Sequence, residues 1–143
     1  MADATESSIV IEASAAAIMD VIADLPAYPE WSEGVKSIEV LTEFDDGRPA
    51  TARFTFDAGV IKDVYELLYD WDGDREVSWK LTKGKVLKTM DGTYSLDEVD
   101  GHTKVNYVLA VGLNIPMLGV MKRQAEKAIV DTALKGLKKR VEG

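Results

Sequence analysis

The stretch PMLGVMKRQAEKAIVDTALKGLKKRV, residues 116–141, decides the fold, because it predicts a long helix that is apolar around more than one face. At about 100° per residue, its apolar residues form two adjacent stripes. The first stripe contains Leu118, Met121, Ala125, Ala128, Ile129, Thr132 and Gly136, and the second contains Val130, Leu134, Leu137 and Val141. A surface helix ordinarily has one apolar stripe. Either this helix is simply well buried, or its first half faces a different apolar environment from its second half.

The composition is that of a globular protein. Of the 143 residues, 46% are hydrophobic and 29% are charged, which suits one domain over residues 1–143. No apolar run approaches the ~18 residues of a membrane-spanning helix, and the acidic start MADATESS is unlike a signal peptide. We therefore expect a cytoplasmic protein without integral membrane association. The absence of cysteine excludes disulfides, thiolate catalysis and cysteine-based metal sites.

The net charge of −8 argues against two classes of partner. Non-specific binding to nucleic acid or to an acidic membrane requires cations for the phosphates, and this chain has an excess of carboxylates. Basic residues do gather in the last turns of the predicted helix, where they complement the carbonyl end of the helix dipole: Lys135, Lys138, Lys139 and Arg140. We expect no nucleic-acid partner.

The N-terminal quarter predicts a strand, a helix and a rigid corner. Residues 6–12 have the alternation of a short strand, and Ser14 suits the N-cap of a helix over residues 15–25. Two prolines end this helix and leave room for at most one further turn in the segment Asp24-Leu25-Pro26-Ala27-Tyr28-Pro29-Glu30-Trp31. The corner therefore holds two aromatic residues in place, Tyr28 and Trp31.

From residue 35 onward the apolar period changes to two, which is typical of strands. Strands are predicted at residues 35–43, 50–58, 60–71, 75–82, 86–97 and 103–112. The turns between them are too short for crossover helices, so the strands must form an antiparallel meander. Such a sheet curls, and only the C-terminal helix is long enough to cover its concave face. The space between a curved sheet and a straight helix is either filled by large side chains or remains a cavity.

Strand alternation predicts which side chains point into this space. The inward rows include Trp79, Tyr94 and Tyr107, whose polar tips need partners when buried, and Met90. The strand at 60–71 is ambiguous, because both of its rows mix apolar residues with carboxylates. If its aromatic row faces outward, it would form a dimer patch of Tyr65, Tyr69 and Trp71. A monomer and a homodimer both remain open.

The order of elements and three segments resemble the polyketide cyclase/dehydrase branch of the START-related, helix-grip superfamily, which also contains the birch pollen allergen. The segments are the corner at residues 24–31, Gly-Thr-Tyr-Ser-Leu at 92–96 and the closing Gly-Leu-Lys-Lys-Arg-Val-Glu. The resemblance covers essentially the whole chain. It implies an α+β helix-grip fold, in which a curved six- to seven-stranded antiparallel sheet wraps around the C-terminal helix and two short helices follow the first strand. It also implies a deep hydrophobic cavity for lipids, sterols, quinones, plant hormones or polyketides.

The resemblance gives weaker support for catalysis. In the aromatising cyclases, a tyrosine after the Pro-Glu corner and an arginine in the fourth strand face the cavity, and the matching positions here are Gly34 and Leu68. Arg53 is the nearby arginine that could substitute, although alternation favours a solvated face for it. Glu66 would face the cavity in the family register, where desolvation would raise its pKa and make it an acid or a ligand acceptor. Its alternative is a surface position paired with a lysine.

Other chemistries find no support in the sequence. The single histidine, His102, lies in a turn, which excludes a core Ser-His-Asp triad and a histidine-rich metal site. The aspartates of the turns lack the spacing of a calcium loop, and the glycines form no phosphate-binding pattern. We therefore expect no metal and no cofactor.

These observations favour a protein that binds a hydrophobic small molecule such as a lipid, polyketide or quinone. The predicted pocket residues are Tyr28, Trp31, Glu66, Leu68, Trp79, Met90, Tyr94, Tyr107, Leu118, Met121 and Ala125. Tyr28 and Trp31 would form the rim, since a proline-braced corner is a plausible lid. The alternative is a cyclase or dehydratase that acts on an aromatic or poly-β-keto intermediate through Arg53 or Glu66. A third possibility is a protein-interaction module with a filled core.

Overall fold

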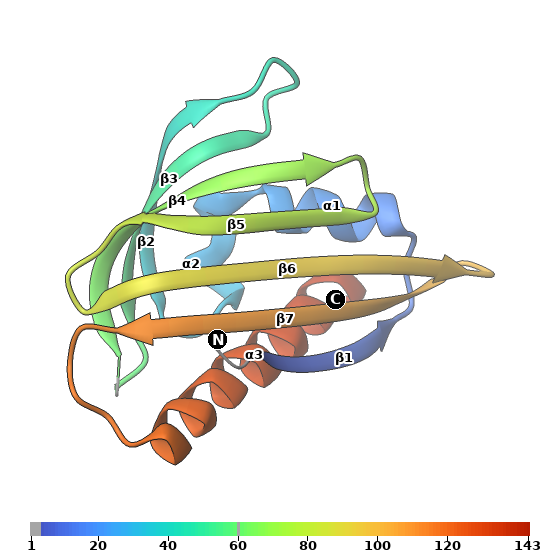
Figure 1. The fold of residues 1–143 in the computed structure, drawn as a ribbon. Helices are drawn as coiled ribbons and strands as arrows, with labels where there is room; N and C mark the ends of the chain where they lie inside the picture. Colours follow the sequence, from blue (N-terminus) through green and yellow to red (C-terminus); the bar gives the residue numbers. More distant parts are fainter. Residues whose placement is uncertain (1–3, 60) are drawn as a thin grey trace.

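The computed structural model describes residues 4–59 and 61–143, which form a seven-stranded antiparallel sheet and a long C-terminal helix (Figure 1). The strands are β1 (Thr5–Ile11), β2 (Val35–Glu43), β3 (Pro49–Asp57), β4 (Lys62–Asp72), β5 (Glu76–Lys83), β6 (Leu87–Val99) and β7 (His102–Leu113). The helices are α1 (Ala15–Ala23), the 3₁₀ turn η1 (Leu25–Ala27), α2 (Tyr28–Trp31) and α3 (Gly119–Glu142). The predicted α+β helix-grip architecture is confirmed, with strand boundaries within about two residues of the prediction.

The two short helices follow from local sequence. Ser14 is the N-cap of α1, and its hydroxyl accepts a hydrogen bond from the backbone N–H of Ala17. The helix ends at Ala23, two residues earlier than predicted, because Pro26 follows in the 3₁₀ turn. The chain then makes the single turn of α2, which carries Tyr28 and Trp31.

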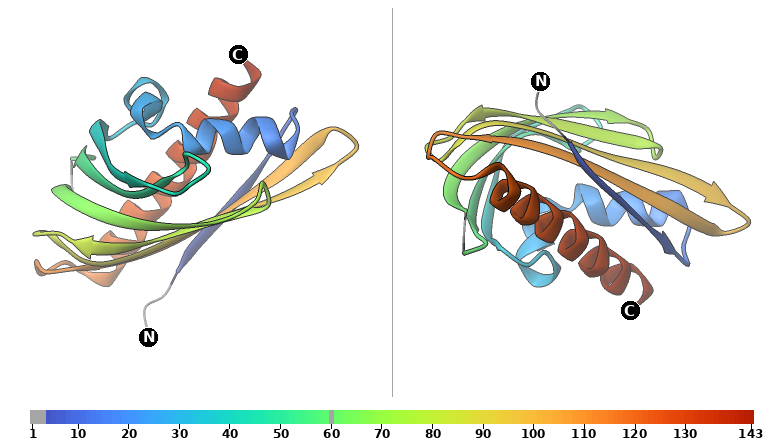
Figure 2. Two further views of the ribbon diagram at one scale, coloured as in Figure 1. Left: turned by 90° about the horizontal axis from the view of Figure 1, so that it is seen from above. Right: turned by 60° about the horizontal axis from the view of Figure 1, so that its bottom comes forward.

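The strand order β1-β7-β6-β5-β4-β3-β2 places β1 and β2 at opposite edges of the sheet. Helices α1 and α2 connect these two edges, and α3 lies diagonally across the concave side (Figure 2). Helix α3 packs against β1 and β7 at one edge and against α1 and α2. The sheet, α2 and α3 therefore enclose a space on three sides.

A buried carboxylate attaches α3 to the β1–β7 edge. Glu126 is fully buried, and its two carboxylate oxygens accept hydrogen bonds from the backbone N–H of Val111 (2.8 Å) and the hydroxyl of Thr5 (2.9 Å). A buried charge is tolerated when such donors satisfy it. Further along the helix, Val130, Leu134 and Leu137 are buried in the core. The second half of α3 thus anchors the helix, as predicted.

The first turns of α3 do not cover the cavity. The helix begins at Gly119 rather than near Pro116, and its first turns lie below β7 in the view of Figure 1. Leu118 is 69% exposed and Met121 is 45% exposed. The prediction that these two side chains line a pocket is therefore wrong, because they face outward and neither lines the inner cavity or the groove beside it. Among the described helices, none is long and apolar enough to cross a membrane.

Candidate ligand-binding cavity

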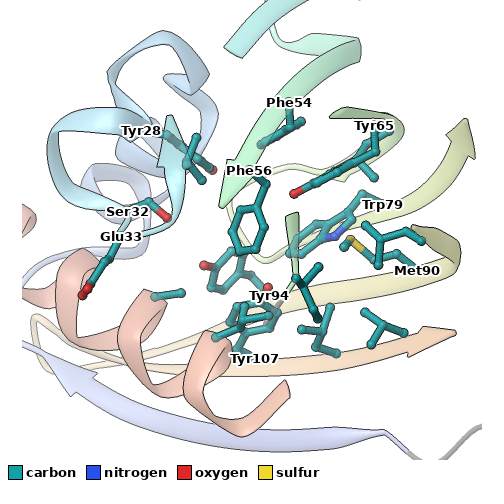
Figure 3. A pocket seen from close by; sticks show the side chains of 18 of the residues that line it. Tyr28, Ser32, Glu33, Phe54, Phe56, Tyr65, Trp79, Met90, Tyr94 and Tyr107 are labelled. Carbon is teal, nitrogen blue, oxygen red and sulfur yellow. The ribbon is translucent and has the colours of Figure 1, made fainter. Parts of the chain in front are cut away.

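An inner cavity of about 80 Å³ lies between the concave face of the sheet, α2 and the middle of α3 (Figure 3). Its aromatic wall consists of Tyr28, Phe54, Phe56, Tyr65, Tyr69, Trp79, Tyr94 and Tyr107. The remaining wall consists of Ser32, Glu33, Val35, Ile61, Leu67, Leu87, Met90, Leu109, Val111, Ile129 and Ala133. The cavity is therefore apolar in its walls but carries several phenol groups.

The structure resolves the ambiguity of strand β4. Tyr65, Leu67 and Tyr69 are buried and line the cavity, whereas Glu66 and Leu68 alternate with them and lie on the outer face. The cavity positions predicted for Glu66 and Leu68 are therefore wrong, since a shift of one residue moves every side chain of a strand to the other face. The conditional dimer patch is also excluded, because Tyr65 and Tyr69 face inward and the indole Nε1 of Trp71 donates to the carbonyl of Pro49.

Glu66 has a partner on the outer face. The guanidinium of Arg53 on the neighbouring strand β3 contacts its carboxylate at 3.3 Å and also pairs with Glu39 at 2.9 Å. Arg53 is 43% exposed at its side chain, as the alternation of β3 predicts. These two ionisable groups, the candidates for catalysis in the sequence, form a surface network rather than part of the cavity.

The strand phenol groups converge on one space from three strands, β4, β6 and β7. Tyr94 and Tyr107 have ring centroids 4.5 Å apart, and Trp79 lies 5.7 Å from Tyr107. Tyr65 stacks on Phe54 with centroids 5.3 Å apart. Figure 3 shows the labelled rings of Tyr65, Trp79, Tyr94 and Tyr107 around the same opening.

Most of these hydroxyls find no partner among the residues that the structure describes. Tyr28 donates its O–H to the carbonyl of Ile22. Within residues 4–59 and 61–143, no protein group forms a hydrogen bond with the hydroxyls of Tyr65, Tyr69, Tyr94 and Tyr107. Buried polar groups in proteins are normally satisfied by protein, water or ligand. The cavity thus presents four O–H groups with spare hydrogen-bonding capacity.

These phenols stay protonated at neutral pH. Burial raises the pKa values of Tyr28, Tyr65, Tyr69, Tyr94 and Tyr107, because the apolar wall disfavours the phenolate. They therefore act as neutral hydrogen-bond donors and acceptors. Within the described lining of the inner cavity, the one ionisable carboxylate is Glu33, and there is no cation or histidine.

A wider groove of about 390 Å³ adjoins the inner cavity and forms its mouth. The two spaces share Glu33, Ile61 and Ile129 as lining residues. The other side chains of the mouth come from the start of β2, the β3–β4 turn and α3: Gly34, Lys36, Asp57, Ala58, Gly59, Ala125, Ala128 and Thr132. Ala125 therefore lies at the mouth rather than in the inner cavity.

The corner at α2 closes one side of the inner cavity. Tyr28 lines the cavity and contacts Trp31, with ring centroids 4.8 Å apart. Trp31 itself lies outside the inner cavity and packs over Gly136 of α3, where a Cβ would overlap the Trp31 carbonyl oxygen. Its Nε1 is buried without a hydrogen-bond partner among the described residues. Trp31 thus connects the corner to α3 instead of forming the rim.

The structure brings together five of the predicted pocket residues in the inner cavity: Tyr28, Trp79, Met90, Tyr94 and Tyr107. Sequence reasoning missed the contributions of Phe54, Phe56, Tyr65 and Tyr69. The row of β4 that contains three aromatic residues is the sequence feature that could have identified Tyr65 and Tyr69, because aromatic side chains are usually buried. Among the described residues, no cluster of three or more His, Cys, Asp or Glu side chains could hold a metal ion.

Comparison with solved structures shows the same fold in proteins of low identity. A START superfamily protein from Mycobacterium smegmatis is 22% identical, with 97% of each chain covered and a TM-score of 0.90. The Zhui aromatase/cyclase from a Streptomyces species is 15% identical over 99% of this chain and 94% of its own, with a TM-score of 0.82. A protein from Thermus thermophilus is 22% identical over 98% of this chain and 97% of its own, with a TM-score of 0.83.

No curated protein sequence matches the chain. Residues 2–142 match the family described as polyketide cyclase / dehydrase and lipid transport, which is nearly the full length of the sequence. The solved structures, at identities below 25%, support the fold that this match implies. The chain therefore belongs to the polyketide cyclase / dehydrase and lipid transport family.

Proposed function

We propose that this protein binds a hydrophobic small molecule that carries oxygen atoms, such as an aromatic polyketide or a quinone. The observation that carries the proposal is the set of four cavity tyrosines without partners among the described residues: Tyr65, Tyr69, Tyr94 and Tyr107. A purely apolar ligand would leave these hydroxyls unsatisfied, at a cost of ~1–3 kcal/mol for each group that it seals from water. A ligand with carbonyl or hydroxyl oxygens would satisfy them.

The dimensions suit a ligand that occupies the inner cavity and the mouth together. At roughly 15 Å³ for each water, the inner cavity alone holds about five waters. Small-molecule sites typically measure about 300–1,000 Å³, so the ligand must extend into the groove of about 390 Å³. The oxygen-bearing part would lie among the tyrosines, and a larger part would lie between Ala125 and the β3–β4 turn.

A cyclase or dehydratase is the second candidate, and the hydroxyl cluster favours it in one respect. Phenol O–H groups directed at a carbonyl stabilise the negative charge that develops on its oxygen during enolisation. The reaction also needs a base, and Glu33 is the one ionisable carboxylate in the described lining of the inner cavity. Arg53 and Glu66 take no part in this version, because they pair on the outer face. Binding without turnover is the better-supported function.

A matched pair of probes tests the proposal. Isothermal titration calorimetry would compare 2-methyl-1,4-naphthoquinone with 2-methylnaphthalene, which has the same ring system without the two carbonyl oxygens. We expect saturable 1:1 binding, with a preference for the quinone of about three- to tenfold for each hydrogen bond gained. Tyr94→Phe and Tyr107→Phe should reduce this preference and leave the affinity for the hydrocarbon nearly unchanged.

Tyr28→Phe is the matched control, because the Tyr28 hydroxyl is already used by the Ile22 carbonyl. This variant should keep the preference for the quinone, even if it is less stable. Equal affinities of the wild-type protein for the two probes would contradict the proposal.

Native mass spectrometry of protein from its own host should show an oxygen-containing hydrophobic ligand. Turnover of a poly-β-keto substrate that is lost in Glu33→Gln would favour the cyclase instead.

A further inference from the structure

We infer that the end of the molecule beside the cavity mouth docks on an anionic membrane surface. The inference starts from the exposed apolar segment at the beginning of α3. Ile115 is 42% exposed, Leu118 69%, Val120 54% and Met121 45%. Large side chains at this exposure in one short segment mark an interaction surface rather than the scattered apolar residues of an ordinary surface.

Lysines lie directly beside this segment. The linker that precedes α3 is held against the β5–β6 turn, because the backbone N–H of Asn114 donates to the Val86 carbonyl (2.8 Å) and its side-chain amide donates to the Lys85 carbonyl (3.0 Å). The turn and its flanks carry three exposed lysines, and none of them forms an ion pair with another described residue: Lys83, Lys85 and Lys88. Lys122, on the first turn of α3, is not counted with them, because its ammonium donates a hydrogen bond to the Val111 carbonyl (2.9 Å).

Two carboxylates at this end are held by other groups, and exposed Glu33 at the mouth is accompanied there by exposed Lys36. Asp63 is buried beneath the turn, where its oxygens accept hydrogen bonds from the backbone N–H groups of Lys85, Val86 and Leu87. Asp57, on the β3–β4 turn, lies 3.7 Å from the ammonium of Lys62. The surface that faces outward at this end is therefore apolar at its centre and basic at its margin.

The opposite end of the sheet has the reverse charge. The turns at residues 44–48, 72–75 and 99–101 lie at that end (Figure 1). They carry Asp45, Asp46, Asp72, Asp74 and Asp100 against Arg48 and Arg75. The net charge of −8 thus conceals a segregation of charge along the molecule. An anionic surface would attract the basic end and repel the acidic end, which fixes the orientation of approach.

A lipid bilayer fits this surface better than a soluble protein partner. Apolar side chains that project beside lysines match an interface in which the former enter the acyl boundary and the latter contact phosphates. The cavity mouth lies at the same end, between the β3–β4 turn and α3. Docking would therefore present the mouth to the membrane, from which a hydrophobic ligand could pass without crossing water. The docking surface itself uses no residue of the inner cavity.

Vesicle flotation tests the inference with the full chain. Vesicles of phosphatidylcholine alone would be compared with vesicles of equal parts phosphatidylcholine and phosphatidylglycerol. We expect binding to the anionic vesicles, weakened by salt. Leu118→Asp and the double variant Lys85→Glu with Lys88→Glu should each weaken it by at least about tenfold.

The controls match these variants in exposure and charge. Val99→Asp removes a side chain that is 53% exposed at the acidic end, and Lys80→Glu with Lys104→Glu changes the net charge equally at strand positions away from the turn. Both should retain binding. Equal binding of the wild-type protein to both vesicle types, or unchanged binding of Leu118→Asp, would overturn the inference. A dimer that Leu118→Asp dissociates, without vesicle binding, would assign the surface to a second copy and also overturn it.

The vesicle experiment tests the docking surface and the naphthoquinone titration tests the cavity, so a negative result in one leaves the other proposal standing. A protein that binds the quinone but no vesicle would retain the proposed cavity function and lose the docking surface. A protein that binds anionic vesicles but neither probe would retain the docking surface and lose the proposed cavity function.

Discussion

Trp79 and Gly92 are cross-strand partners on β5 and β6, and the indole lies so close over the glycine that a Cβ on Gly92 would overlap Trp79 Cε2. The absence of a side chain at Gly92 therefore sets the position of the largest aromatic ring in the cavity wall.

Gly92→Ala should displace this indole and lower the stability of the protein by ~1–3 kcal/mol, because overpacking forces side chains off their preferred rotamers. Thermal unfolding and the tryptophan emission spectrum would measure both effects. Gly119→Ala is the control, since a Cβ there would meet nothing within 4 Å. If Gly92→Ala melts like the wild-type protein, the contact with Trp79 is unimportant.

Ala125→Trp should block the mouth with little loss of stability. Ala125 lines the groove, and a tryptophan side chain would occupy much of the path to the inner cavity. The affinity for 2-methyl-1,4-naphthoquinone should fall by more than about tenfold, equivalent to ~1.4 kcal/mol. Gln124→Trp places the same side chain at an exposed position of α3 and should bind normally. Equal affinities of the two variants would show that ligands reach the cavity by another route.

Leu137→Ala should lower the stability and leave the ligand affinity unchanged, which is the reverse of Ala125→Trp. The expected loss is ~2–5 kcal/mol in the free energy of unfolding. Leu137 is fully buried in the second half of α3, away from both the inner cavity and the mouth. Urea denaturation would give the stability. Calorimetric titration with 2-methyl-1,4-naphthoquinone, without urea and at a temperature where the variant is folded, would give the affinity. A variant that keeps its stability but loses the ligand would contradict the assignment of this half of α3 to anchoring.

Leu118→Asp should stabilise the fold by roughly 1 kcal/mol while it removes an exposed apolar side chain. Leu118 is the N-cap of α3 and makes no side-chain capping bond, whereas an aspartate accepts hydrogen bonds from the first free N–H groups of the helix and favours its positive end. Thermal unfolding would measure the gain. A lower melting temperature would show that Leu118 packs against the protein.

The buried phenols predict a loss of stability at alkaline pH. Below about pH 10 the tyrosines are protonated in both the folded and the unfolded protein, so their contribution to the free energy of unfolding does not change with pH. Above about pH 10 the unfolded chain releases these protons, whereas the folded chain retains them because its pKa values are raised. Each such tyrosine then costs ~1.4 kcal/mol per pH unit.

Phenolate absorbance during a pH titration checks this prediction. Ionisation of the tyrosines should coincide with unfolding, and ligand binding should be unaffected by phenol titration between about pH 6 and pH 9. Ionisation at about pH 10 in a protein that remains folded would show that water reaches the hydroxyls freely.

The fold was predictable because its signals are local. Ser14, the prolines of the corner and the turns between the strands each specify one element, and the period of two specifies the meander. Three cavity residues, Trp79, Tyr94 and Tyr107, followed from the same alternation because each lies in a strand whose other row is polar.

The errors arose where the local pattern leaves a choice. For Glu66 and Leu68 the two mixed rows of β4 decide nothing, and the cavity positions follow only from the resemblance; burial of Tyr65 and Tyr69 against neighbouring strands sets the opposite face. The apolar stripe of α3 predicts an inward position for Leu118 and Met121, yet both side chains are exposed in the structure. Periodicity identifies a face of a helix but not how far the partner surface extends.

The carboxylate of Glu126 has a consequence for how the protein opens. Its hydrogen bonds to Val111 and Thr5 join α3 to β7 and β1, so a swing of the helix away from that edge would expose an unpaired charge to an apolar interior. A second attachment joins α3 to the corner, where Arg140 pairs with Glu30 at 3.0 Å and Gly136 packs against Trp31. The mouth, by contrast, is lined by small residues of α3 and by Ala58 and Gly59. Because α3 is attached both to the β1–β7 edge and to the corner, we expect the protein to open for a ligand at the mouth rather than by a swing of the helix.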